Sequence, residues 1–170
     1  MVSKALLDAI IAQCTLPLRG AHGVFHWARV LENGRLLASL TGARPVVVEL
    51  FAILHDAKRQ NERRDPDHGR RAAVYARSLG DRLGLDEGDL DLLALACAGH
   101  VDGLTEGDVT VQTCWDADRL DIGRVGIRLD PRYLCTTAAR DRMLRQEAVA
   151  RSVGGYVPEW VRDEWGISDE

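Results

Sequence analysis

The feature that most constrains the fold of this chain is the apolar stretch VVVELFAIL, residues 46–54, which ends abruptly in His55 and Asp56. Burying an unsatisfied imidazole or carboxylate costs free energy, so this ending predicts that nearby groups or an ion satisfy the pair. Residues 46–48 are β-branched, but residues 49–58 are better helix formers, and the stretch is longer than an ordinary strand. It therefore indicates a buried helix, with a parallel strand as the alternative.

Helical periodicity also dominates the rest of the chain. Apolar residues recur at helical spacing in residues 5–12 and 22–40. Within the second segment, Asn33-Gly34 predicts an interrupted helix or a helix-turn-helix rather than a hairpin, because its flanks do not alternate. Further helices are predicted over residues 67–84, 86–101, 110–126 and 136–153, the last with a capping threonine. The pattern predicts an all-α fold, a compact bundle of several helices.

Length and composition bound the domain organisation. The chain has 170 residues, 46% of them hydrophobic, which suits one globular domain. We assign residues 1–150 to this domain and residues 151–170 to a C-terminal extension, in which a docked turn from residue 158 leads into a frayed acidic end.

Charge and hydropathy exclude some partners. A formal net charge of -4 without a long basic stripe argues against a nucleic-acid duplex. No segment approaches the ~20 apolar residues of a membrane helix, and the N-terminus has no cleavage-site pattern, so we expect a cytoplasmic protein that binds no membrane. The four cysteines lack CxxC spacing, which predicts reduced thiols in or near the core rather than a zinc ribbon or a disulfide framework.

Histidines and acidic residues gather at the ends of the predicted helices. The five histidines lie in polar segments around those helices, and Asp118 sits among apolar neighbours in CWDADRLD. A divalent ion binds neutral imidazoles and ionised carboxylates on rigid elements. Adjacent helical residues point about 100° apart, so His55 and Asp56 can share one ion only at a helix terminus. The sequence thus predicts a metal centre built from helix ends.

The order of these residues resembles the signature of the HD-domain metal-dependent phosphohydrolases, a histidine, a His-Asp pair and a distal aspartate. The matching segments are HWARV, ILHDAKR and WDADRLD, and the resemblance covers roughly residues 20 to 140. It implies an HD-domain bundle with a metal centre between helices, in which the ligands are His26, His55, Asp56 and Asp118. The chain lacks the His-Asp-x-Gly-Lys and Gly-Tyr-Pro elements of the branch that acts on cyclic dinucleotides.

Three further histidines have places near this signature. The positions of His68 and His100 resemble those that complete a second metal site or bind substrate phosphate in some branches. His22 lies four residues before His26 and is expected to touch substrate or to orient a ligand.

Arginines near the signature can bind phosphate. Arg59 follows Asp56 by three residues, where related branches place a cation that holds the substrate phosphate. In the alternative, Arg59 belongs with Lys58, Arg63 and Arg64 to a solvated face. Arg119 and Asp121 are expected to form a structural pair beside Asp118 just as readily as to serve the site.

The resemblance implies hydrolysis of a phosphate ester, of a nucleotide or another small phosphorylated metabolite, by metal-activated water. One or two ions of Mn, Mg, Co, Ni, Zn or Fe would be bound, with Asp56 and Arg59 as catalytic residues and Arg59, His22, His68 and His100 as substrate contacts. A diiron oxygenase of the same fold and a non-catalytic metal- or nucleotide-binding regulatory module are the alternatives. No general base is assigned, and a homo-oligomer stays open.

Overall fold

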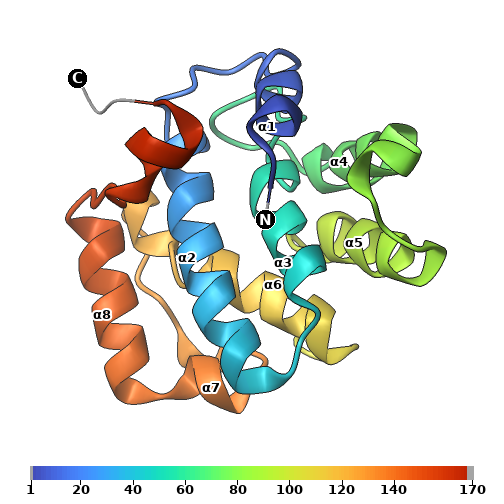
Figure 1. Ribbon diagram of the computed structural model, residues 1–170. Helices are drawn as coiled ribbons and strands as arrows, with labels where there is room; N and C mark the ends of the chain where they lie inside the picture. Colours follow the sequence, from blue (N-terminus) through green and yellow to red (C-terminus); the bar gives the residue numbers. More distant parts are fainter. Residues whose placement is uncertain (1, 168–170) are drawn as a thin grey trace.

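A computed structural model describes residues 2–167, and within them the regular secondary structure is entirely helical, which confirms the predicted all-α fold (Figure 1). The α-helices are α1 (Lys4–Ile11), α2 (Val24–Thr41), α3 (Pro45–Leu54), α4 (His68–Leu79), α5 (Glu87–Gly99), α6 (Val109–Arg119), α7 (Thr137–Arg140) and α8 (Arg142–Val153). Short helical turns lie between or after these helices, at η1 (Gly80–Leu83), η2 (Ile122–Val125), η3 (Pro131–Tyr133) and η4 (Val161–Trp165).

Helix α3 lies at the centre of the molecule, where it contacts α2, α5 and α6 (Figure 1). Because neighbours enclose it on several sides, most of its side chains are buried, from Val47 through Leu54 with Glu49 half-buried. Pro45 occupies the first helical position, where a missing N–H costs nothing. The apolar stretch is therefore a buried helix, and the strand alternative is wrong.

The predicted interruption at Asn33-Gly34 is also wrong, because α2 runs continuously through both residues. Gly34 lies where α2 approaches α3 closely, and a Cβ added there would be 2.6 Å from Val48 Cγ1. Asn33 Nδ2 donates to the carbonyl of Ala117 in α6 at 3.2 Å. Helix packing therefore explains both residues, and no turn is needed.

Three predicted helices are shorter than their patterns indicated. The segment 136–153 divides at Asp141, whose ψ of 135° breaks the helix into α7 and α8. Thr136 is the capping threonine, since its hydroxyl accepts from the N–H of Ala139 at 3.1 Å. In the segment 67–84, the α-helix ends before Gly80, whose φ is 51°. In the segment 110–126, it ends at Arg119.

Residues near the C-terminus join the same core. Val161 and Trp165 are buried, and η4 contacts α1. The predicted boundary at residue 150 falls inside α8, and residues 168–170 of the predicted frayed end lie outside the described residues. The four cysteines are free thiols, of which Cys97 and Cys114 are buried. Among the described residues, no helix has the length and apolar composition that a membrane span requires.

Candidate metal centre

Helix ends bring six of the sequence-predicted residues together. His26 lies in the first turn of α2, His55 and Asp56 directly follow α3, and His68 begins α4. His100 directly follows α5, and Asp118 lies in the last turn of α6. All are buried except Asp118, which is half-buried. Because the helices end here, both His55 and Asp56 can face the same centre.

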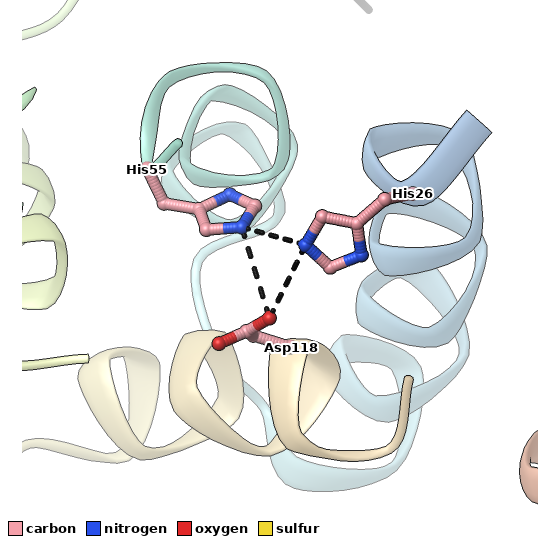
Figure 2. Close-up of side chains that lie close together, drawn as sticks. All are labelled: His26, His55 and Asp118. Carbon is pink, nitrogen blue, oxygen red and sulfur yellow. Dashed lines mark hydrogen bonds and ion pairs between the residues drawn. The ribbon is translucent and has the colours of Figure 1, made fainter. Parts of the chain in front are cut away.

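One group of ligand atoms consists of His26, His55 and Asp118, which point toward one another from three helices (Figure 2). The Nε2 atoms of His26 and His55 are 3.0 Å apart. Asp118 Oδ1 lies 3.4 Å from Nε2 of His26 and 3.7 Å from Nε2 of His55. Three ligand atoms at these separations can surround a single cation.

A second group consists of Asp56, His68 and His100. The Nε2 atoms of His68 and His100 are 2.8 Å apart. Asp56 Oδ1 lies 3.0 Å from Nε2 of His68 and 3.8 Å from Nε2 of His100. This group has the same composition as the first, with two imidazoles and one carboxylate.

The carboxylate of Asp56 faces both groups. While its Oδ1 points at His68 and His100, its Oδ2 lies 3.6 Å from Nε2 of both His26 and His55. A carboxylate that offers one oxygen to each of two adjacent sites is able to bridge two ions.

Hydrogen bonds fix which nitrogen of each imidazole faces the centre. Backbone carbonyls accept from Nδ1 of His55, His68 and His100, and the carboxylate of Asp121 accepts from Nδ1 of His26 at 2.7 Å. An imidazole that donates through Nδ1 and is neutral carries its lone pair on Nε2. Each group therefore contains two Nε2 lone pairs in contact, at 3.0 Å and 2.8 Å, which repel unless a cation or proton lies between them. This donor set fits a metal ion.

The electrostatics favour the metal-binding state of His55, Asp56 and Asp118, whereas His100 differs: burial lowers its pKa, but the hydrogen bond to Asp56 and the charge of Asp118 outweigh burial and raise it. Burial lowers the pKa of His55 to about 3, so its imidazole stays neutral. Burial opposes ionisation of Asp56 and Asp118, but when no ion is bound, surrounding imidazoles that carry a proton, with Arg124 beside Asp118, outweigh burial and hold the pKa of both carboxyls well below the usual range.

Asp121 supports His26 and was not assigned this role from the sequence. Its carboxylate accepts from His26 and forms two hydrogen bonds with Arg29, at 2.7 Å and 3.1 Å. A carboxylate behind a ligating histidine fixes the ring and raises its basicity. The pair expected between Asp121 and Arg119 is therefore not formed, because Arg119 donates to the carbonyl of Tyr133 instead.

Arg59 lies beside the second group. Its Nη1 is 3.5 Å from Asp56 Oδ1 and 3.1 Å from Nε2 of His68, and its Nη2 donates to the carbonyl of Arg63 at 2.9 Å. Arg59 is buried, whereas Arg63 and Arg64 are exposed, so Arg59 does not belong to a solvated face.

His22 lies outside both groups. It precedes the first residue of α2, and its Nδ1 is 2.6 Å from Glu62 Oε2. The ring packs edge-on against His26 at a centroid distance of 6.5 Å. His22 therefore neighbours a candidate ligand but belongs to neither ligand group.

A cavity of about 430 Å³ opens beside the centre, and Asp56, His68, His100 and Asp118 form part of its lining. One wall is the connection between α6 and α7, residues 120–136, which we call the cavity loop. Four arginines also line the cavity: Arg59, Arg119, Arg124 and Arg128.

The sequence left Arg119 open between a structural pair with Asp121 and a role in the site, and the structure places it in the cavity lining. It is buried, its Nη2 has no hydrogen-bond partner, and no carboxylate among the described residues lies within 4.0 Å of its guanidinium. A buried charge without a counter-ion is costly, and an anion in the cavity would provide one. Its position directly after Asp118 was the available signal.

The fold and the centre define an all-α protein with a buried His/Asp cluster that could hold metal ions beside an arginine-lined cavity. Comparisons with protein-family models, curated proteins and solved structures find no match. The chemistry of the site itself therefore carries the functional argument.

Proposed function

We propose that this chain is a metal-dependent phosphohydrolase of the HD-domain type, acting on a nucleotide or another small phosphorylated metabolite. The observation that carries the proposal is that two ligand groups share Asp56 beside a cavity lined by arginines. Paired cation sites and guanidinium groups suit a phosphate ester, because both neutralise its oxygens.

Each residue has a definite task in this proposal. His26, His55 and Asp118 would hold one ion, and His68 and His100 would hold the other, with Asp56 between them. Bound ions would supply a water of lowered pKa and charge neutralisation for the phosphoryl group. Asp121 holds the ring of His26 in its ligating orientation.

The arginines would bind the phosphate. Arg119 has an unsatisfied guanidinium nitrogen, and Arg59 lies beside Asp56 and His68. Both line the cavity, where a fork of N–H groups can donate two charge-assisted hydrogen bonds to phosphoryl oxygens.

The test begins with the metal content of the purified protein, followed by phosphate release from a panel of esters with Mn, Mg, Co or Ni added. We expect metal-dependent release that is abolished in His55→Ala and in Asp118→Ala, together with reduced metal content, since each change removes a ligand. His22→Ala is the matched control, because His22 is a partly buried histidine outside both groups. This variant should keep the metal content of the wild type.

Other results would point elsewhere. Two bound irons with substrate-dependent oxygen uptake would favour the oxygenase alternative, and metal and nucleotide binding without turnover would favour a regulatory module. Full metal content and activity in both ligand variants would contradict the assigned centre.

A further inference from the structure

Much of the cavity lining outside the candidate ligands and the arginines is apolar. The cavity loop contributes Ile122, Val125, Ile127, Leu129 and Tyr133, and Val101 follows α5. Several of these large side chains are open to solvent, with Ile127 53% and Tyr133 54% exposed. A group of exposed apolar side chains around one cavity marks a surface that a ligand or partner covers.

The polar groups of the cavity are nearly all charged. Beyond the candidate ligands and the four arginines, the polar lining consists of Asp130 and the hydroxyl-bearing Tyr133. Asp130 already accepts from the guanidinium of Arg132. No Ser, Thr, Asn or Gln side chain lines the cavity among the described residues. Recognition of sugar hydroxyls or nucleobase edges would therefore rest on Arg124, Arg128, Asp130 and Tyr133, whereas the apolar side chains of the lining offer such groups no hydrogen bond.

The apolar wall is held in place by the helix that carries Asp118. The carboxylate of Asp116 accepts from the backbone N–H groups of Cys135 and Thr136, at 2.7 Å and 2.8 Å, and from the Thr136 hydroxyl at 2.8 Å. Arg119 Nη1 donates to the Tyr133 carbonyl at 2.6 Å. The end of the cavity loop is therefore fixed relative to the metal centre, which favours a preformed binding surface.

We infer that the phosphate esters taken by this site carry an apolar organic group, alkyl or aryl, which packs against the Ile127 side of the cavity while the phosphate faces the His/Asp cluster and Arg119. The inference rests on the proposed function, because it concerns the organic half of the same substrate. It places the substrate among small apolar phosphate esters rather than nucleotides.

The experiment compares esters of equal charge on the metal-loaded protein. Ethyl, butyl and hexyl phosphate form an apolar series, and glycerol phosphate, ribose 5-phosphate and a nucleoside 5′-monophosphate form the polar set. We expect kcat/KM to rise roughly three- to fourfold for each methylene that reaches the wall. Hexyl phosphate should exceed ribose 5-phosphate by at least about tenfold.

A variant tests whether the apolar wall around Ile127 causes the preference for longer alkyl chains. Ile127→Asn should reduce the advantage of hexyl over ethyl phosphate by roughly tenfold, while ethyl phosphate itself is turned over nearly as before, because its chain is too short to reach the wall. Leu40→Asn is the matched control, since Leu40 is 60% exposed on α2 and does not line the cavity. It should leave the preference unchanged.

A binding measurement separates this inference from the proposed function. Hexylphosphonate, which is not hydrolysed, should bind the metal-loaded protein more tightly than ethylphosphonate and with a more negative heat-capacity change. If no ester releases phosphate but this chain-length dependence holds, the proposed function fails and the apolar ligand site stands.

Two outcomes would overturn the inference. One is turnover and binding that do not depend on chain length, or that favour ribose 5-phosphate or the nucleotide. The other is an Ile127→Asn protein with an altered oligomeric state and an unchanged substrate preference, which would assign the exposed apolar residues to a contact between copies of the chain.

Discussion

At the scale of single residues, the groups behind the candidate ligands decide how well the ligands are held. Asp121 is buried, and Arg29 balances its charge while His26 donates to it. The carboxylate of Asp121, itself held by the guanidinium of Arg29, thus turns Nε2 of His26 toward His55 before any ion arrives.

Asp121→Asn is expected to weaken metal binding by about 10- to 100-fold, because an amide accepts less strongly from His26 and no longer balances Arg29. Competition with a metal-binding dye measures this change. Asp91→Asn, which removes only a surface contact with Arg77, is the control and should bind metal normally. Equal affinities in all three proteins would exclude a supporting role for Asp121.

Arg119 provides a second prediction at this scale. Arg119→Ala should keep its metal but lose roughly 1.5 to 3 kcal/mol in kcat/KM for a phosphate ester, the range for a hydrogen bond to a charged group. Arg119→Lys should recover part of the loss, since the charge remains but the fork does not. Arg63→Ala, at an exposed position, is the comparison, and an identical small effect at both positions would leave Arg119 without a role in binding.

At the scale of elements, the approach of α4 to α5 determines whether His68 meets His100. Gly69 follows His68, and a Cβ added to it would lie 2.5 Å from the carbonyl oxygen of Cys97 and 3.1 Å from the His100 ring. The backbone of α5 cannot yield to this contact as a flexible side chain would. Only glycine at this position permits the observed spacing of the two helices.

Gly69→Ala is therefore expected to separate α4 from α5 and to lower the metal content of the second group more than that of the first. Elemental analysis, with the stoichiometry compared to the wild type, measures the effect. Gly88→Ala is the matched control in α5, because its Cβ would meet only Asp86 Oδ1, at 3.4 Å. Loss of metal from Gly88→Ala as well would indicate a general weakness of α5 rather than a local clash.

The helices were predictable from the sequence where the signal was local. Apolar periodicity located α1, α2, α4 and α5, and the residue types at their ends drew attention to the histidines and aspartates that the structure brings together. Gly34 was misread, because its reason is the distance to Val48 in another helix. The roles of Asp121 and Arg119 stayed open for the same reason, since they depend on contacts with distant residues that no local pattern contains.

At the scale of the whole molecule, the C-terminal residues support the candidate metal centre. Arg29 donates to the carbonyl of Tyr156 at 3.0 Å, and the Ser152 hydroxyl donates to the carbonyl of Asp121 at 2.9 Å. Val161 and Trp165 add apolar side chains to the core. The segment after residue 150 is thus connected to the residues that orient His26.

A chain ended after residue 150 is expected to unfold at lower temperature and to bind metal more weakly, because it loses these hydrogen bonds and the buried side chains of Val161 and Trp165, among others. Thermal denaturation and metal titration measure both effects. A chain ended after residue 167 is the control and should match the full chain. Unchanged stability and affinity in the shorter protein would support an independent domain over residues 1–150.

The hydrogen bond between Arg29 and Tyr156 joins residues that are 127 positions apart in the sequence. During synthesis, Arg29 is therefore made well before the carbonyl to which it donates. His26 and Arg29 leave the ribosome before Tyr156, whose carbonyl helps to hold Arg29 behind His26. At ~5–20 residues per second, the interval is roughly 6 to 25 s. We therefore expect a nascent chain to expose His26 without being able to retain an ion, so that metal loading follows translation rather than accompanying it.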